Sequence, residues 1–322
     1  MRPRAGRCGS NACGKRKHTE RETVLAQLID GKAIAAAIRT ETAAESAAFR
    51  SAGVTPKLAV ILVGDDPASG QYVRNKEKAC AEAGIVSETI RLPGSSDTAA
   101  LLDRIRLLNE DPAVHGLLVQ VPLPKQIDEA AVLLAVSPEK DVDCFHPLNV
   151  GRLIAGFDAD SFVPCTPAGI VEMLMRSGNP PAGKRVVIVG RSAIVGKPLA
   201  LLLMGKGPSA DATVTVCHTR TPDLAVFTRT ADILVAAAGR PEMIRGDMVR
   251  SGAVVIDVGT NRVPDPTGAK PYRWVGDVCF DEVFPKASHI SPVPGGVGPM
   301  TIAMLLRNTL TACRRHERSR ST

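Results

Sequence analysis

Three polar side chains share one face of a predicted helix in the first third of the chain. Asp66 is a favoured N-cap for this helix and Gly84 a favoured stop. Ser69, Tyr72 and Lys76 lie three and then four residues apart, so they form one stripe along the helix. A hydroxyl, a phenol and an amine in one stripe could bind a polar substrate and transfer protons. The alternative is a solvated face with an exposed lysine.

Two further segments place polar groups where a ligand could bind. Val119-Gln-Val-Pro-Leu-Pro124 ends a predicted strand, and open α/β sheets bind ligands at that end of their strands. Lys140-Asp-Val-Asp-Cys-Phe-His-Pro147 places two acids in an otherwise apolar turn. Each segment alone could be an ordinary capped loop.

A glycine turn typical of dinucleotide binding occurs in the second half of the chain. Val186–Val189 is predicted to be a buried strand, and Gly190 allows a sharp turn after it. Gly196 allows the backbone to approach a phosphate or the strand closely, and the helix that begins there could direct its N–H groups at an anion. The spacing differs from G-x-G-x-x-G, so a simple tight turn is the alternative.

The next predicted strand indicates which dinucleotide would bind. NAD-binding domains usually place an acid after this strand, whereas a 2′-phosphate favours cations and hydroxyls. Thr213–Val216 runs into Cys217-His-Thr-Arg220 with no acid. Arg191 and Ser192, just after the first glycine, could hold the phosphate through charge-assisted hydrogen bonds. We therefore expect NADP rather than NAD.

The elements that position these residues alternate between short β-branched runs and helical patterns. Such alternation predicts an α/β fold with mostly parallel sheets, here in two lobes, the second Rossmann-like, with the active-site cleft between them. The expected domains are a disordered basic extension (1–22), a catalytic domain (23–163), an NADP-binding domain (164–298) and a C-terminal helix with a basic tail that returns to the first domain (299–322). The expected strands are Leu58–Val63, Ile85–Leu92, Leu117–Val121, Val186–Val189, Thr213–Val216, Ile233–Ala237 and Val254–Val258.

Composition and charge exclude several classes of protein. The 322 residues carry a formal charge of +7, but residues 1–22 hold +5 and residues 307–322 hold +4, so the body between them is close to neutral. A neutral body with 3% aromatic residues is poorly suited to nucleic-acid binding. No apolar run approaches the roughly 20 residues of a membrane span.

The eight cysteines are scattered, which indicates reduced thiols of a cytoplasmic protein rather than a disulfide framework. Cys8, Cys13 and His18 would make only a partial metal site, so we expect no metal.

Five motifs in order carry a family resemblance over about residues 25–313. They are Tyr72-Val-x-x-Lys76, Val119-Gln-Val-Pro-Leu-Pro, Lys140-Asp-Val-Asp, Gly190-Arg-Ser-x-x-Val-Gly-x-Pro198 and Pro292-Val-Pro-Gly-Gly-Val-Gly-Pro-Met-Thr301. The chain resembles the bifunctional methylenetetrahydrofolate dehydrogenase/methenyltetrahydrofolate cyclohydrolase family of one-carbon metabolism. The resemblance implies a folate-binding first domain, NADP as cofactor and a homodimer. The charge distribution and the lack of a long apolar run predict no nucleic-acid or membrane partner, and the scattered cysteines predict a cytoplasmic protein.

The resemblance also implies roles for matched residues. Lys76 would be the catalytic lysine, Gln120 would orient it, Tyr72 would lie along the folate ring and Asp143 would hold the amino and amide edge of the pterin. The folate would also contact Val119, Val121, Pro294, Gly295, Gly296, Val297 and Gly298, and the NADP would contact Gly190, Arg191, Ser192, Thr219 and Thr260.

Two positions depart from the family pattern, and two other functions remain open. Cys144 stands where the family usually has Gly, which bears on the backbone beside Asp143, and Thr260 stands where Ile is common.

One alternative is an NADP-dependent dehydrogenase of another small substrate, or a family member with only one of the two activities. The other is a non-catalytic nucleic-acid binder that uses the basic tails.

Overall fold

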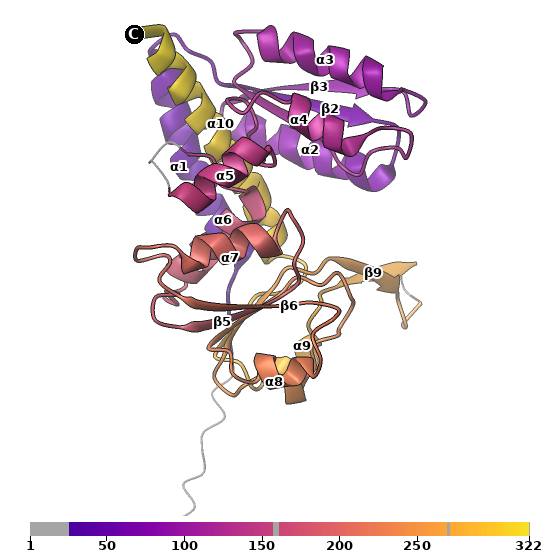
Figure 1. The fold of residues 1–322 in the computed structure, drawn as a ribbon, viewed down its shortest axis with the longest axis vertical. Helices are drawn as coiled ribbons and strands as arrows, with labels where there is room; N and C mark the ends of the chain where they lie inside the picture. Colours follow the sequence, from indigo (N-terminus) through magenta and orange to yellow (C-terminus); the bar gives the residue numbers. More distant parts are fainter. Residues whose placement is uncertain (1–25, 157–160, 269–270, 322) are drawn as a thin grey trace, which may run out of the picture.

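The computed structural model describes residues 26–156, 161–268 and 271–321, which form two lobes joined by long helices (Figure 1). The expected basic extension and the cysteines Cys8 and Cys13 lie outside the described residues. Each lobe is built on a parallel sheet with helices against it, as the alternating pattern predicts.

The first lobe contains a three-stranded parallel sheet in the order β3-β2-β4. The strands are β2 (Lys57–Val63), β3 (Val86–Leu92) and β4 (Gly116–Val119), and the helices beside them are α2 (Pro67–Glu82), α3 (Thr98–Glu110) and α4 (Glu129–Ala135). Aspartates begin all three helices: Asp66, Asp97 and Asp128 each accept hydrogen bonds from backbone N–H groups of the first turn. The central strand β2 is apolar almost throughout because both of its faces are covered.

The second lobe contains a six-stranded parallel sheet in the order β1-β11-β8-β7-β5-β6. Its strands are β5 (Arg185–Val189), β6 (Thr213–Cys217), β7 (Ile233–Ala236), β8 (Val254–Asp257), β11 (His289–Ile290) and β1 (Gln27–Leu28). Around it lie α7 (Gly196–Met204), α8 (Leu224–Thr228), a 3₁₀ turn (Gly246–Met248) and α9 (Phe280–Val283). Strands β9 (Asn261–Pro264) and β10 (Tyr272–Val275) form a separate antiparallel pair.

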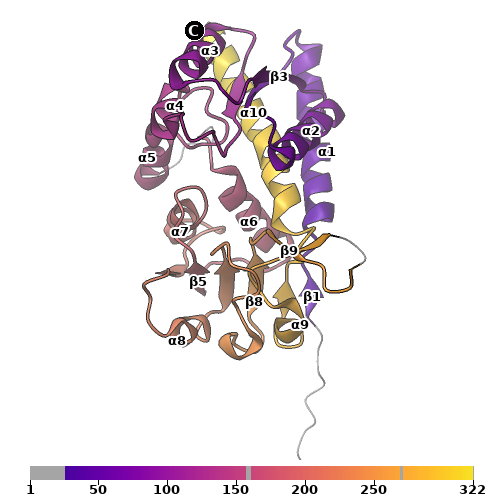
Figure 2. The same ribbon diagram turned by 90° about the vertical axis from the view of Figure 1, so that its right-hand side faces the viewer.

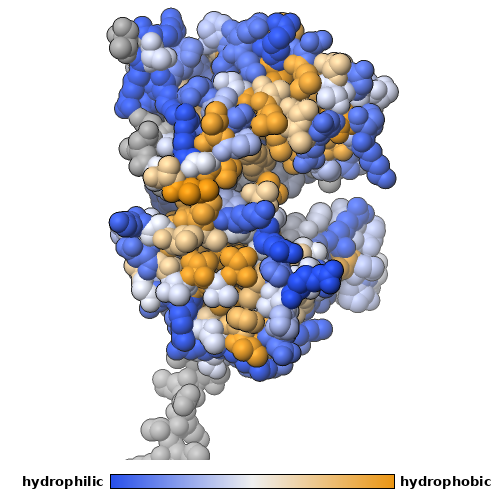
Figure 3. Space-filling view, in the orientation of Figure 1, coloured by the Kyte–Doolittle hydropathy of each residue, from blue (hydrophilic) through white to orange (hydrophobic). Residues whose placement is uncertain are grey.

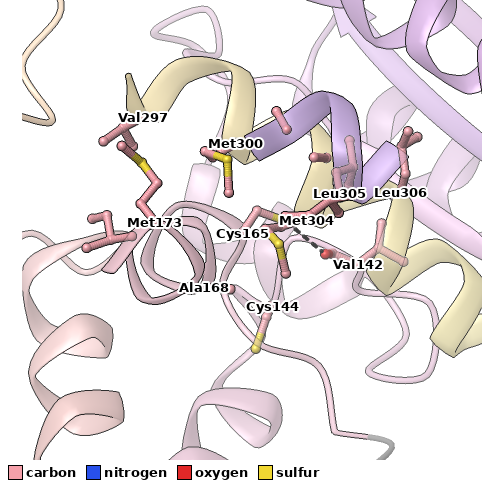
Figure 4. Close-up of a cluster of buried hydrophobic side chains, with 14 of the residues drawn as sticks. Val142, Cys144, Cys165, Ala168, Met173, Val297, Met300, Met304, Leu305 and Leu306 are labelled. Atoms are coloured by element: carbon pink, nitrogen blue, oxygen red, sulfur yellow. Dashed lines mark hydrogen bonds between the residues drawn. The ribbon is translucent and has the colours of Figure 1, made fainter. Parts of the chain in front are cut away.

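Long helices connect the two lobes. Helices α1 (Gly31–Ser51) and α10 (Val297–Ser321) start at the second lobe and run along the first, with α6 (Cys165–Arg176) beside them and α5 (Pro147–Ala155) near the first lobe (Figure 2). The apolar faces of α1, α6 and α10 meet in one buried cluster (Figure 4). The residues drawn there include Val142, Met173, Met300, Met304 and Leu305. A single core therefore couples the lobes through these helices.

The structure differs from the sequence-based expectation at one domain boundary. Residues 23–163 were expected to belong to the first domain, but β1 pairs with β11 and completes the sheet of the second lobe. A two-residue strand carries too short a pattern to be recognised, and its pairing depends on a partner more than 250 residues away. Strands β4, β7 and β8 also end one or two residues earlier than expected, while β9, β10 and β11 were not anticipated.

Candidate active site

The predicted helix stripe points into a cavity of the first lobe. Lys76 on α2 is only 7% exposed, and its Nζ donates a 2.9 Å hydrogen bond to Oε1 of Gln120, which follows β4. The cavity has a volume of about 490 Å³, and its walls include Ser69, Tyr72 and Asp143. The interpretation of Lys76 as a solvated surface residue is therefore wrong.

Gln120 is held so that its carbonyl oxygen faces the lysine. Its Nε2 donates to the carbonyl oxygen of Val121 at 2.6 Å, and its backbone N donates to the carbonyl oxygen of Ile61 on β2. The side-chain amide therefore has a defined orientation, with Oε1 left for Lys76. Val119 and Val121 lie in the same wall. A buried amine that is bound by one neutral acceptor is well placed to meet a substrate atom.

The two acids of the Lys140–Asp143 segment have different surroundings. Asp141 is a structural residue, because its carboxylate accepts hydrogen bonds from the backbone N of Phe145, the backbone N of His146 and Nδ2 of Asn149. Asp143 lines the cavity instead. Burial raises the pKa of Asp143, and Asp141 raises it further, whereas Lys76 and a hydrogen bond from the Cys165 thiol lower it. Asp143 is therefore the acid that is available to a ligand.

The cysteine beside Asp143 adopts a backbone conformation that favours glycine. Cys144 has φ of +60°, and its buried thiol donates to the carbonyl oxygen of Phe162 at 3.4 Å. The left-handed turn that a glycine would allow is thus kept with a larger residue, whose side chain fills the core (Figure 4).

Tyr72 lies between this cavity and a second pocket that separates the lobes. The tyrosine is 42% exposed and lines both spaces. The interlobe pocket has a volume of about 350 Å³, and its lining combines Tyr72 with Thr260 after β8 and with the loop that precedes α10. The predicted loop residues Pro294, Gly295, Gly296, Val297 and Gly298 all belong to this lining. The space-filling view shows the molecule hollowed between the two lobes (Figure 3).

Close approach of backbone segments requires glycine at two positions of the turn after β5. Gly190 has φ of +134°, and a Cβ there would lie 2.0 Å from the carbonyl oxygen of Ala237 after β7. A Cβ on Gly196 would lie 2.1 Å from the carbonyl oxygen of Gly190 itself. The turn occupies the carboxyl end of β5, whose neighbours β6 and β7 lie on opposite sides. This is the topological switch point at which doubly wound sheets bind ligands.

The groups around this turn fit NADP. Arg191, Ser192 and Thr219 are exposed at the carboxyl edge of the sheet, and no acid follows β6 before Arg220. The Ser192 hydroxyl oxygen accepts from the backbone N–H groups of Val195 and Gly196, which leaves its proton to donate to an anion. An exposed guanidinium beside a hydroxyl suits a 2′-phosphate.

Two buried acids that the sequence analysis did not single out organise the same edge. The Asp277 carboxylate accepts from the backbone N–H groups of Ala238, Gly239 and Arg240 at 2.6–2.9 Å and from Nδ2 of Asn261 at 2.8 Å. It therefore ties the loop after β7 to the strand β9 that follows Thr260. The only signal for this role is an acid within an apolar stretch, which does not reveal its distant partners.

The other acid, Asp257 at the end of β8, lines the interlobe pocket. Its carboxylate accepts from the backbone N–H groups of Gly259, Asp277 and Val278. Burial raises the pKa of Asp257 to about 7, against the lowering effect of these hydrogen bonds. A Cβ on Gly276 would lie 1.7 Å from Oδ2 of Asp257, so this packing requires glycine.

The segment that follows the expected domain boundary at residues 163 and 164 also reaches the cavity. Cys165 and Thr166, at the start of α6, line it together with Thr301 of α10, and the two threonine hydroxyls are 2.9 Å apart. In the sequence analysis only a domain boundary is placed here, and neither Cys165 nor Thr166 is singled out.

In the described part of the chain all six cysteines are free thiols, and no cluster of three or more potential metal ligands is found. None of the described helices has the length and hydropathy that a bilayer crossing requires.

Comparison with known families matches both lobes. Residues 29–143 match the catalytic domain of tetrahydrofolate dehydrogenase/cyclohydrolase, and residues 164–317 match the NAD(P)-binding domain of the same family.

Related proteins cover nearly the whole chain. A protein named bifunctional protein FolD from Chlorobium phaeobacteroides is 56% identical over 90% of this chain and 98% of its own length, and one from Moorella thermoacetica is 55% identical over 90% and 99%. The crystal structure of a FolD from Trypanosoma brucei, complexed with NADP cofactor and inhibitor, superposes with a TM-score of 0.85 at 46% identity, covering 91% of this chain and 99% of that one. The Campylobacter jejuni enzyme gives 0.84 at 47% identity, covering 90% and 99%. The chain therefore belongs to the tetrahydrofolate dehydrogenase/cyclohydrolase family.

Proposed function

We propose that this protein oxidises methylenetetrahydrofolate to methenyltetrahydrofolate with NADP and then hydrolyses the product to formyltetrahydrofolate. The observation that carries the proposal is the buried Lys76–Gln120 pair, which faces a cavity that also contains Asp143 and opens past Tyr72 to the interlobe pocket. Both activities require a folate held between an amine of the first lobe and a nicotinamide of the second.

The first-lobe residues would bind and orient the folate. The Asp143 carboxylate would accept hydrogen bonds from the amino and amide groups of the pterin, which resemble a guanidine edge. Tyr72, at the junction of the cavity and the pocket, would pack against the flat part of the substrate. The loop Pro294–Gly298 would cover the opposite side.

The oxidation demands orientation more than acid–base chemistry. When bound, NADP accepts the hydride that leaves the methylene carbon, and the remaining positive charge is shared between the two flanking nitrogens. The residues of this chain would hold the reacting carbon toward the second lobe. Arg191 and Ser192 would anchor the 2′-phosphate, Thr219 would contact the adenosine side, and Thr260 the nicotinamide side, with Gly190 keeping the turn close to the cofactor.

The hydrolysis requires proton transfers, for which Lys76 is the candidate. Water would add to the methenyl carbon and lose a proton to Lys76 Nζ, which would return it to the ring nitrogen as the bond between that nitrogen and the carbon breaks. The remaining hydroxyl proton is released to solvent as the formyl C=O forms. Gln120 would hold the amine at the required position through its 2.9 Å hydrogen bond.

Two assays test the proposal directly. With methylenetetrahydrofolate and NADP, we expect formation of NADPH and of methenyltetrahydrofolate, each followed by its absorbance. With methenyltetrahydrofolate alone, we expect loss of its absorbance faster than in buffer. NADPH formation without accelerated hydrolysis would indicate a monofunctional dehydrogenase, and neither activity would refute the proposal.

We also propose that the protein acts as a homodimer in the cytoplasm. The free thiols of the described cysteines suit a reducing compartment. Strand β3 is at the edge of the first-lobe sheet, and within the described residues no strand pairs with its outer side. A second copy could pair there. Light scattering after size exclusion would give twice the chain mass of 33.9 kDa for a dimer.

A further inference from the structure

The chain has a single tryptophan, and it lies at the interlobe pocket. Trp274 belongs to β10, one strand of the antiparallel pair β9–β10, which we call the arm. Figure 1 shows the arm extending from the second lobe below α2 of the first. Trp274 is 42% exposed and lines the pocket together with Gln71, Tyr72 and Asn75 of α2. The pocket is therefore bordered by one exposed aromatic side chain from each lobe.

Neighbouring side chains define the orientation of the indole. Tyr272 lies on the same face of β10, and the two rings make an edge-to-face contact with centroids 5.8 Å apart and planes at 85°. Arg262 of β9 is the register partner of Trp274, and its guanidinium carbon lies 3.6 Å from the centroid of the Tyr272 ring. These contacts order the aromatic surface before a ligand arrives, which reduces the entropy lost on binding.

The arm is also connected to the body of the second lobe. Arg273, on the face opposite to Trp274, forms an ion pair with Glu242, with 3.4 Å between Nη2 and Oε1. Val275, the next residue along β10, is buried. The position of Trp274 in the pocket wall is therefore fixed by both neighbours in the strand.

The route of the substrate identifies the group that reaches Trp274. In the proposed function the pterin lies in the cavity with Lys76 and Asp143, and the p-aminobenzoyl ring is the next planar group of a folate. Tyr72 lines both the cavity and the interlobe pocket, so a folate that extends past Tyr72 places this ring in the pocket. A flat ring of that kind can pack against an indole.

The nicotinamide of NADP is the competing occupant, because Thr260 lines the same pocket. However, Gly190, Arg191 and Ser192 of the glycine turn are not part of its lining. The wall is formed instead by α2 and by the loop Pro294–Gly298, which are expected to bind folate. The lining therefore favours the folate ring.

We propose that Trp274 packs against the p-aminobenzoyl ring of the bound folate and contributes to its affinity in both reactions, an inference that rests on the proposed function. The folate then contacts an aromatic side chain of each lobe, Tyr72 and Trp274. Because Lys76, the group that transfers the proton in hydrolysis, lies in the first lobe, Trp274 affects KM rather than kcat of that step.

The test measures the KM for folate in each reaction separately. In Trp274→Leu, which removes the ring but keeps an apolar side chain, we expect the KM for methenyltetrahydrofolate, measured without NADP, to rise roughly twofold to tenfold. The KM for methylenetetrahydrofolate should rise by a similar factor, whereas the KM for NADP should change little. Trp274→Phe keeps a ring and should stay closer to the unmodified protein.

The matched control removes an aromatic ring elsewhere on the second lobe. Phe227 is 37% exposed on α8 and lines neither the cavity nor the interlobe pocket, so Phe227→Leu should leave every KM unchanged. An unchanged KM for methenyltetrahydrofolate in Trp274→Leu would overturn the proposal, as would a rise confined to the KM for NADP or an equal effect of Trp274→Phe. The absence of turnover in the unmodified protein would instead refute the proposed function.

Fluorescence tests the contact in the unmodified protein, because all tryptophan emission comes from Trp274. Acrylamide quenching of the emission lifetime is measured for the protein alone, with NADP, and with 5-formyltetrahydrofolate at a concentration that inhibits the dehydrogenase. This folate has no carbon bridge between its two nitrogens and undergoes neither reaction. We expect it to lower the quenching rate constant roughly twofold or more, since a bound ring excludes the quencher, and NADP to leave it unchanged. No change with the folate, or an equal decrease with NADP alone, would contradict the proposal.

Discussion

Lys76 is the residue on which the hydrolytic chemistry depends, and its surroundings make that dependence testable. Its amine is buried and donates to the neutral amide of Gln120, and its charge also lowers the pKa of the neighbouring Asp143. In Lys76→Met we expect cyclohydrolase activity to fall by roughly 10²–10⁴-fold, the usual contribution of a positioned proton-transfer group. Dehydrogenase activity should survive in part, because hydride transfer needs orientation only.

The control for this variant is Arg74→Met, which removes an exposed cation two residues earlier on the same helix. It should leave both activities unchanged. Both rates would be measured on the same preparation, so a folding defect would lower them together. Equal retention of the two activities in Lys76→Met would remove the lysine from the mechanism.

Arg191 is the residue on which we expect the specificity for NADP over NAD to depend. Its exposed guanidinium follows the glycine turn, where a 2′-phosphate would lie. In Arg191→Ala we expect the KM for NADP to rise roughly tenfold or more, because a charge-assisted hydrogen bond usually contributes that much to binding. The KM for NAD should change little. The control Lys184→Ala removes an exposed cation at the opposite end of β5. An unchanged ratio of the two KM values would contradict the assignment of NADP specificity.

The pH dependence of folate binding follows from Asp143. Because burial raises its pKa, the carboxylate is lost at a higher pH than an ordinary aspartate would lose it. If the carboxylate binds the pterin, the KM for folate should rise as the pH falls through this raised pKa. Asp143→Asn should show a higher KM throughout and no such rise. A KM profile that is flat on the acid side in the unmodified protein would argue against this role.

At the scale of elements, the loops at the carboxyl edge of the second sheet depend on Asp277. Its two oxygens accept hydrogen bonds from three backbone N–H groups of the loop after β7 and from Nδ2 of Asn261 in β9. In Asp277→Asn one oxygen becomes an N–H₂ group, which leaves two of these donors without an acceptor, at about 1–3 kcal/mol each. We expect a lower melting temperature and a KM for NADP that rises severalfold.

Cyclohydrolase activity is the internal reference for this variant, since hydrolysis uses groups of the first lobe. It should be retained in Asp277→Asn at a temperature at which the variant is folded. Asp281→Asn removes an exposed acid four residues later and should behave like the unmodified protein. Parallel loss of both activities would show that Asp277 maintains the fold in general rather than the cofactor edge.

The elements that could be predicted from the sequence are those with a local signal. The N-cap Asp66 and the spacing of Ser69, Tyr72 and Lys76 specify α2 and its functional face, and the apolar run of β5 with Gly190 specifies the turn at the switch point. The Lys76–Gln120 contact joins residues 44 positions apart, and the order of the motifs rather than any local pattern pointed to it.

What the sequence could not predict depends on contacts between distant segments. The pairing of β1 with β11, and the hydrogen bonds of Asp277 to residues 16–39 positions away, form only when the whole sheet assembles. The different roles of Asp141 and Asp143 could not be predicted either, because they depend on the geometry of the loop. The Asp141 carboxylate binds backbone N–H groups, whereas Asp143 lines the cavity.

At the scale of the whole molecule, the relative position of the lobes rests on helices α1, α6 and α10. Besides their shared apolar core, they are joined by a charge network: Arg176 of α6 binds both oxygens of Glu41 on α1 at 2.8 and 2.9 Å, and Arg307 of α10 binds Glu172 at 2.7 Å. The two arginines lower the pKa of both Glu41 and Glu172. The start of α1 is fixed too, since a Cβ on Gly31 would lie 1.9 Å from the carbonyl oxygen of Gly296 in the site loop.

A tight packing position between α6 and α10 offers a way to disturb this arrangement without replacing a residue of the site. A Cβ on Gly169 would lie 2.8 Å from Cβ of Met300, which cannot move without the α10 backbone. Gly169→Ala should therefore push the helices apart and reduce the free energy of unfolding by about 1–3 kcal/mol. Hydride transfer needs both lobes in register, whereas hydrolysis relies on the first, so we expect dehydrogenase activity to fall more than cyclohydrolase activity. The control Gly151→Ala lies on α5 with nothing within 4 Å of its Cβ and should not be destabilising. An unaltered ratio of the two activities in a destabilised Gly169→Ala would show that the lobes keep their register independently of this helix contact.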